Sequence, residues 1–235
     1  MRDEIMAEAA RYPNLRIVFT DAADSNSRQI QDVHTLLSSG IDLLIISPNE
    51  SEALSPIIAE AYKRIPVILL DRPAVPYPQR GHHDLVGIDN RRAGYVVTDH
   101  LLGLGARRVA FVALPNAAPT VEAREAGYRE ALHARGLPPD PSLVRRLDPT
   151  DAAAVRALLE AHRPDAVVCA NDWTAARLMH AILALGYAVP GDVRLVGIDD
   201  VDYASLLPVP LTTLRQPTRQ IGAAALAAML ERVAG

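Results

Sequence analysis

Two kinds of apolar pattern alternate along the chain. Short runs rich in Val, Ile and Leu predict buried strands, and they cover residues 15–19, 41–46, 67–70, 109–113, 166–169 and 193–198. Between these runs, apolar residues recur every three or four positions, which predicts helices that stop at a glycine; examples are residues 28–39, 121–135 and 173–185. Repeated strand–helix–strand units predict an α/β fold of parallel sheets flanked by helices. The 235 residues suffice for one doubly wound sheet or two smaller ones, and the pattern alone does not choose.

Polar side chains follow almost every predicted strand. In open parallel sheets, ligands bind outside the carboxyl ends of the strands. Carboxylates, amides and a guanidinium gather at these ends, and together they suit hydroxyl groups, each of which both donates and accepts a hydrogen bond. The pattern therefore predicts a polyhydroxylated ligand, with candidate contacts at Asp21, Asp24, Asn49, Glu50, Asp71, Arg72, Asp89, Asn90, Asn171, Asp172, Asp199, Asp200 and Gln216.

A structural explanation competes for each of these residues. Asp and Asn are common after strands because they cap the following helix or hold a turn. A single such residue therefore indicates little, and only the recurrence at successive strand ends favours a binding site. Asp172 and Asp200, each second in its pair, are the strongest candidates for helix caps.

Composition and charge narrow the class of protein. With 49% hydrophobic and 22% charged residues, the chain can bury a full core. No apolar run approaches the roughly 20 residues of a membrane helix, and Met1 opens a charged stretch instead of a signal peptide, so we expect a soluble, cytoplasmic protein. The net charge of −4 argues against a large DNA-binding surface on this chain itself. The single cysteine, Cys169, lies in an apolar run and is expected to fill the core.

An enzyme is the main alternative from another class, because Asp and Glu pairs can serve as acid and base and such a sheet can carry a nucleotide. However, Gly103 and Gly105 are followed by Arg108 where a dinucleotide-binding motif needs its third glycine. The sequence also lacks a phosphate-binding loop, a nucleophile elbow and a zinc-protease motif. The pair His82-His83 is more typical of a solvated loop than of a metal site. We expect no catalytic residues, no cofactor and no metal.

Ordered motifs in the second half resemble the lac-repressor (LacI/GalR) family of transcription regulators. They begin with Val-Gly-Ile-Asp-Asn-Arg-Arg-Ala-Gly at 86–94 and continue in the family's order through residues 100–105, 108–112, 123–128, 170–172, 189–193, 196–200 and 211–217. Several ordered blocks make a specific match, unlike a lone short motif. In the first half, residues 24–30 and 69–72 are similar to the periplasmic sugar-binding proteins that share this fold.

The resemblance implies two similar lobes of the periplasmic-binding-protein type, joined by three crossovers and closing on a ligand in the cleft between them. The first lobe would be residues 1–90 with 218–235, and the second residues 91–217. The family's opening strand, final strand and helix-turn-helix headpiece would be missing from this chain. The implied partners are a sugar effector, operator DNA through that headpiece and a second copy in a homodimer, with no membrane. A purine or nucleoside effector stays open, because related regulators bind these on the same scaffold.

The resemblance also implies ligand contacts, which largely coincide with the strand ends found above: Asp71, Arg72, Asp89, Arg124, Asn171, Asp199 and Gln216. Family members often carry an aromatic contact where Pro149 and Thr150 stand here. Trp173 either takes that role by stacking on a sugar face or is a half-buried residue at a helix start. A sugar-binding protein of an ABC transporter and the sensor module of a membrane kinase share the fold and are the closest alternative functions. The block at 211–217 favours the regulator.

Overall fold

The computed structural model describes residues 2–74, 84–115 and 118–234, so the predicted His82-His83 pair lies outside the described residues. The chain divides into two compact units. The first unit is Met1–Ile88 with Pro217–Gly235, and the second is Asp89–Gln216. Both units contain a parallel sheet flanked by helices, which confirms the predicted fold class.

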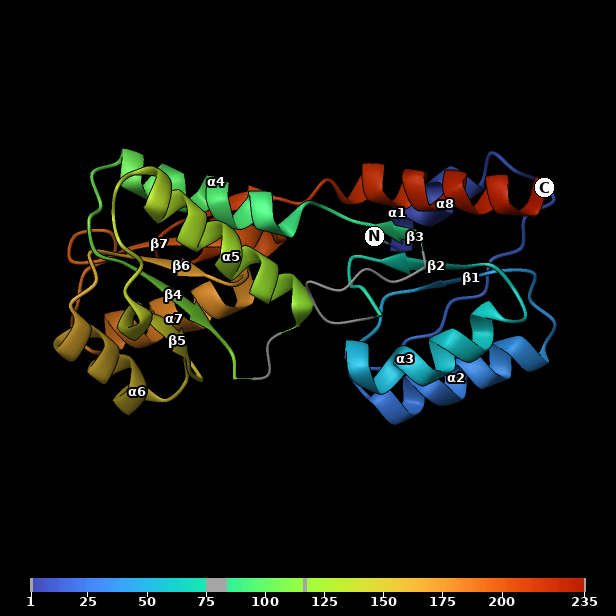
Figure 1. Cartoon of the computed structure of the whole chain (residues 1–235), viewed down its shortest axis with the longest axis horizontal. Helices are drawn as coiled ribbons and strands as arrows, with labels where there is room; N and C mark the ends of the chain where they lie inside the picture. Colours follow the sequence, from blue (N-terminus) through green and yellow to red (C-terminus); the bar gives the residue numbers. More distant parts are fainter. Residues whose placement is uncertain (1, 75–83, 116–117, 235) are drawn as a thin grey trace. The chain divides into compact units, whose positions relative to one another are not determined.

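The sheet of the first unit has three parallel strands in the order β1-β2-β3, which are β1 (Leu44–Ile46), β2 (Val67–Leu70) and β3 (Asp84–Val86). Its two faces carry different helix pairs (Figure 1), namely α2 (Asn26–Ser38) with α3 (Ser51–Tyr62), and α1 (Arg2–Ala9) with α8 (Thr218–Ala234). Side chains along a strand alternate between the faces. Accordingly, Leu44 and Ile46 join the core under α2 and α3, and Ile45 packs with Ile221 of α8.

The sheet of the second unit has five parallel strands in the order β5-β4-β6-β7-β8. They are β4 (Val109–Ala113), β5 (Val144–Arg146), β6 (Ala166–Cys169), β7 (Arg194–Asp199) and β8 (Thr212–Arg215). Helices α4 and α5 cover one face and α6 and α7 the other (Figure 1); they span Asn90–Gly103, Pro119–Ala134, Ala152–Ala157 and Asp172–Ala184. Two short 3-10 helices, η1 (Pro141–Leu143) and η3 (Asp202–Leu206), and the π-helical segment η2 (Leu158–His162) that continues α6 complete the unit. This arrangement puts the carboxyl ends of β6, β7 and β8 side by side.

One predicted strand is wrong. Residues 15–19 form no strand, and Val18 and Phe19 are 52% and 37% exposed. An extended segment becomes a strand only when a neighbouring strand supplies ladder hydrogen bonds, and no described strand pairs with this one. Instead, the guanidinium of Arg2 lies over the ring of Phe19, with its central carbon 5.4 Å from the ring centre.

Cys169 fills the core as predicted. It is fully buried in the cluster between the sheet and helices α6 and α7, and burial raises the pKa of its thiol. No helix in the described ranges is both long and apolar enough to cross a bilayer.

Candidate functional site

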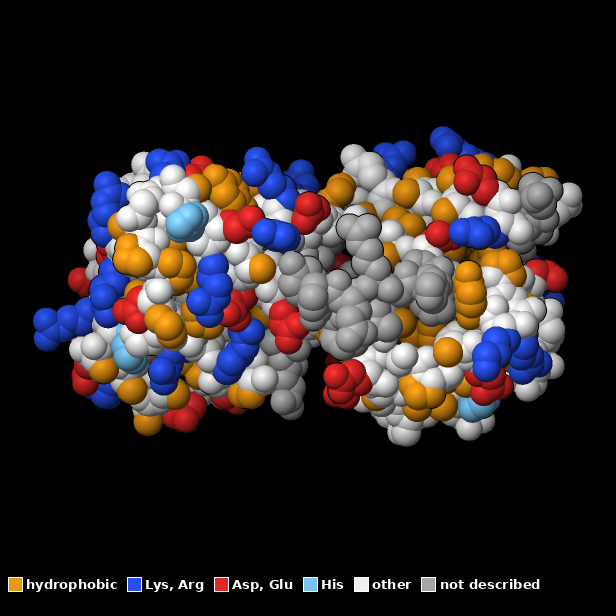
Figure 2. All heavy atoms as spheres, viewed as in Figure 1, with side chains coloured by type: hydrophobic (Ala, Val, Ile, Leu, Met, Phe, Trp, Pro, Cys, Tyr) orange, Lys and Arg blue, Asp and Glu red, His pale blue; other side chains and the backbone are white. Residues whose placement is uncertain are grey.

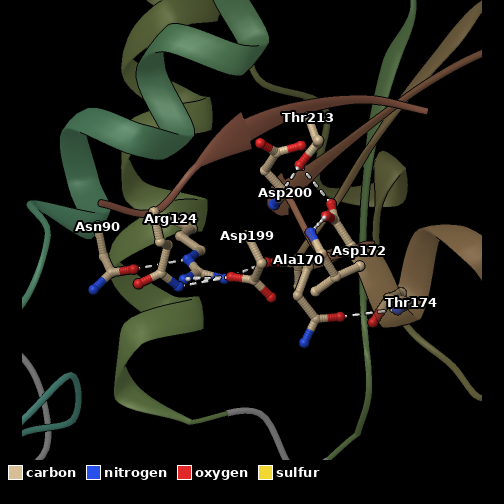
Figure 3. Close-up of polar contacts among 11 residues, drawn as sticks. Asn90, Arg124, Ala170, Asp172, Thr174, Asp199, Asp200 and Thr213 are labelled. Atoms are coloured by element: carbon tan, nitrogen blue, oxygen red, sulfur yellow. Dashed lines mark hydrogen bonds and ion pairs between the residues drawn. The ribbon is translucent and has the colours of Figure 1, made fainter. Parts of the chain in front are cut away.

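The carboxyl edge of the second unit's sheet carries a connected group of polar side chains centred on Arg124 (Figure 3). Arg124 lies on α5 and is only 4% exposed. Its Nε donates to Oδ1 of Asn90 at 2.7 Å, and its Nη1 donates to the carbonyl oxygen of Ala170 at 2.6 Å. Its Nη2 lies 3.7 Å from Oδ1 of Asp199. The guanidinium thus ties α4, β6 and β7 together at the edge where a ligand of a parallel sheet binds.

Two glycines bring Arg124 to this edge. A Cβ added at Gly94 of α4 would lie 2.0 Å from the carbonyl oxygen of Arg124, and one added at Gly127 of α5 would lie 1.9 Å from that of Arg91. Real Cβ atoms do not approach so closely, so both positions require glycine for the two helices to cross. The crossing places Asn90, at the start of α4, against Arg124.

Asp199 ends β7 in an unusual conformation and remains partly accessible. Its φ is 139° and that of Asp200 is 58°, both outside the usual range of non-glycine residues. The Asp199 carboxylate accepts from Nε2 of Gln216 at 2.7 Å and is 28% exposed. The backbone N–H of Gln216 donates to the carbonyl oxygen of Asp199 at 3.2 Å. The structure therefore brings three predicted ligand residues, Arg124, Asp199 and Gln216, into one group.

Asn171 and Asp89 lie at helix starts in the same unit. Asn171 is the N-cap of α7, with its Oδ1 accepting from the N–H of Thr174 at 2.9 Å. Asp89 is the exposed N-cap of α4 and accepts from the N–H of Arg92 at 2.9 Å. Each cap uses one side-chain oxygen. No other hydrogen bond between described residues occupies the amide nitrogen of Asn171 or the second carboxylate oxygen of Asp89.

The predicted caps at Asp172 and Asp200 are wrong. Asp172 is the first residue of α7 and is completely buried, and its carboxylate accepts from Thr213 and from the N–H of Val201. Asp200 instead accepts from the guanidinium of Arg215. For Asp172 the error arises because Asn171, the first member of the pair, occupies the capping position of α7, and for Asp200 because the next helical turn, η3, begins after Val201.

Trp173 is 41% exposed on α7. The guanidinium carbon of Arg177 lies 3.9 Å from its ring centre, so one face of the indole is covered by a cation–π contact. Stacking of a sugar on Trp173 is therefore confined to the other face, and the predicted role stays a prediction.

The predicted residues of the first unit, Asp71 and Arg72, follow β2. Asp71 has a φ of 63°, its N–H donates to the carbonyl oxygen of Val86 at 2.8 Å, and its Oδ1 is buried with no hydrogen-bond partner among the described residues. Arg72 donates from Nη1 to the carbonyl oxygen of Asn49 at 2.7 Å. The amide nitrogen of Asn49, after β1, is likewise buried without a described partner. Buried polar atoms are almost always hydrogen-bonded, so each of these two atoms lacks a hydrogen bond that its burial requires.

Asn49 and Asn90 stand at predicted strand ends but were not among the residues that the family resemblance implied. The signal for Asn90 was its place beside Asp89, and its importance lies in the bond to Arg124. Among the described residues, no three side chains of His, Cys, Asp and Glu gather to hold a metal ion.

Comparisons with known proteins place this geometry in context. Residues 98–235 match the model of the periplasmic binding protein-like domain. The ribose operon repressor of Escherichia coli K12 is 28% identical over 221 residues, which are 92% of this chain and 66% of that protein. A solved complex of the transcriptional regulator CelR with cellobiose is 31% identical with a TM-score of 0.79, covering 99% of this chain and 71% of that one. A LacI-family regulator from Sanguibacter keddieii is 30% identical with a TM-score of 0.79, covering 99% of this chain and 83% of that one. The chain thus spans less than two thirds of the repressor's length.

Proposed function

Because the chain belongs to the LacI family of transcriptional regulators and carries its periplasmic binding protein-like domain, we propose that it is the effector-binding core of a regulator whose effector is a sugar. The observation that carries the proposal is the group formed by Arg124, Asp199 and Gln216. It combines a buried guanidinium with a carboxylate that remains 28% exposed. A sugar hydroxyl can donate to that carboxylate and accept from a neighbouring N–H.

We assign the contacts of the second unit to Asp199, Arg124, Gln216, Asn171 and Asp89. Asp199 would accept from a hydroxyl, and Asn171 would donate from its amide nitrogen. Trp173 is assigned a stacking contact through the indole face that Arg177 does not cover.

In the first unit we assign Asp71 and Arg72 to the same effector. The buried Oδ1 of Asp71 supports this, since a ligand hydroxyl would supply its missing donor. An effector shifts a conformational equilibrium only if it binds one conformation more tightly than the other, which is what a conformational signal requires.

We further propose that the whole protein acts in the cytoplasm as a homodimer and binds operator DNA through a separate segment. The net charge of −4 supports a division of labour, because phosphate neutralisation needs clustered Lys and Arg. The relatives reported above are regulators rather than enzymes or transport proteins, so we propose neither of those alternatives.

Thermal unfolding with a panel of candidate ligands tests the proposal. A ligand that binds only the folded state raises its stability, by about 2.7 kcal/mol at roughly a hundredfold excess over Kd. D-Ribose, cellobiose, other pentoses and hexoses, and the nucleosides adenosine and cytidine form the panel. We expect at least one sugar to raise the unfolding temperature. A rise with nucleosides alone would replace the sugar by a nucleoside, and no rise with any member would count against the proposal.

A further inference from the structure

Asp172 is a buried carboxylate that forms hydrogen bonds at the sheet edge of the second unit (Figure 3). It lies at the start of α7 and is 0% exposed. Its Oδ1 accepts from the hydroxyl of Thr213 on β8 at 2.6 Å, and its Oδ2 accepts from the N–H of Val201 at 3.1 Å. A ligand cannot contact a side chain with no exposed surface, so any role of Asp172 in binding must act through other residues.

The hydroxyl of Thr213 extends this link to Asp200. While it donates to Asp172, it also accepts from the N–H of Asp200 at 3.2 Å. Asp172 and Thr213 therefore hold two successive backbone N–H groups, those of residues 200 and 201, which come directly after Asp199.

The backbone at this point needs such support. Asp199 and Asp200 have φ values of 139° and 58° in succession. Non-glycine residues adopt these values only when the surrounding structure fixes them. The hydrogen bonds from the N–H groups of Asp200 and Val201 to Thr213 and Asp172 help to fix the turn, together with the ion pair between Asp200 and Arg215 of β8.

Gly197 leaves space for the buried carboxylate. A Cβ at Gly197 would lie 2.1 Å from Oδ1 of Asp172 and 3.0 Å from Cδ2 of Leu211. The carboxylate of Asp172 therefore packs directly on the backbone of β7, two residues before Asp199. Any side chain at position 197 would push it away.

We propose that Asp172 and Thr213 are positioning residues that set the orientation of the Asp199 carboxylate toward Arg124 and Gln216, and thereby the affinity for the effector. The part of this inference that concerns affinity rests on the proposed function. The part that concerns the turn and Arg124 does not, because it describes the protein without ligand.

The test uses substitutions at Thr213. Asp172→Asn is unsuitable, because in either orientation its NH2 group faces a donor, the N–H of Val201 or the hydroxyl of Thr213, and this can prevent folding. Thr213→Val has nearly the same shape but removes both hydrogen bonds, and Thr213→Ser keeps the hydroxyl. Tyr128→Phe is the control: like Thr213→Val it removes a hydroxyl that donates a hydrogen bond within this unit, here to the carbonyl oxygen of Val109 at 2.8 Å, at the first residue of β4.

The first readout needs no ligand. In nuclear magnetic resonance spectra, we expect Thr213→Val to shift the Nε–H signal of Arg124 and to speed hydrogen exchange of the residue 200 and 201 amides by about tenfold or more, the scale of one lost hydrogen bond. Thr213→Ser should restore both, and Tyr128→Phe should leave both as in the wild type. If Thr213→Val changes these signals no more than Tyr128→Phe does, the positioning role is wrong.

The second readout is calorimetric affinity for D-ribose and cellobiose. For whichever sugar binds the wild type, we expect Thr213→Val to raise Kd by about tenfold or more, with Thr213→Ser close to the wild type. Unchanged affinity in Thr213→Val would overturn the link to binding. If neither sugar binds the wild type, the titration uses the other sugars of the thermal panel; binding of none of them counts against the sugar effector, and the positioning of Asp199 is then decided by the ligand-free spectra alone.

Discussion

Gly94 of α4 lies so close to Arg124 of α5 that a Cβ at Gly94 would be 2.0 Å from the carbonyl oxygen of Arg124. The same close approach sets the distance between the Asn90 amide and the guanidinium. The packing of two helices and the geometry of the candidate site are therefore one feature of the fold.

The first prediction follows from this contact. Gly94→Ala should force α4 and α5 apart and lower the free energy of unfolding by about 1–3 kcal/mol or more. Gly103→Ala in the same helix is the control, because a Cβ there meets nothing within 4 Å. Urea unfolding measures both, and equal stabilities of the two variants would contradict the account.

Arg124→Lys is predicted to be a disruptive change. An ammonium group cannot reproduce the planar fork that reaches both Asn90 and Ala170, so we expect a loss of about 1–3 kcal/mol in unfolding free energy and weaker sugar binding. Arg129→Lys on the same helix should change little, because Arg129 pairs with Glu125, one helical turn earlier, and 40% of the Arg129 side chain is exposed. Urea titrations of both variants check this, and a stable Arg124→Lys protein with unchanged binding would contradict it.

Asp71 is predicted to favour binding at the expense of stability. Its φ of 63° suits glycine, and its Oδ1 is buried without a described partner. Asp71→Gly should therefore keep or raise the free energy of unfolding, by up to about 1 kcal/mol, while sugar affinity falls. Asp71→Ala removes the same carboxylate but keeps the strained backbone, so it should be the less stable of the two. The reverse order in thermal unfolding would show that backbone strain is not the controlling factor.

A pH dependence is predicted for Tyr128. Burial raises the pKa of its phenol above the ordinary value of 10.0. Since the folded pKa is the higher one, the stabilising contribution is complete below about pH 10, the unfolded pKa, and declines as pH rises above it. Urea unfolding between pH 8 and about 11 should show a steeper loss of stability for the wild type than for Tyr128→Phe. Parallel curves would contradict this assignment.

The sequence predicted some elements well, for reasons that are visible in the structure. The strands predicted at 67–70, 109–113 and 166–169 have those bounds, because their apolar runs are buried on both faces of a parallel sheet. Residues 15–19 carry the same signal but pair with no described strand, and composition cannot supply a partner.

The site was predictable in its location and less so in its details. Asp199 and Gln216 were found because they follow strands. The buried role of Asp172 depends on Gly197 and Thr213, which meet it only in the folded chain. Similarly, no strand pattern indicates that Arg177 covers one face of Trp173.

The most direct test of the sugar-binding assignment is calorimetric titration of the best sugar from the thermal panel into the wild type, Asp199→Ala and Glu160→Ala. Glu160 is an exposed carboxylate in η2, paired with Arg156. We expect saturable one-to-one binding to the wild type, a loss of about 1–3 kcal/mol in binding free energy for Asp199→Ala, and wild-type affinity for Glu160→Ala. Binding that is the same in all three proteins, or absent from the wild type, would contradict the assignment of Asp199 and its neighbours as the effector site.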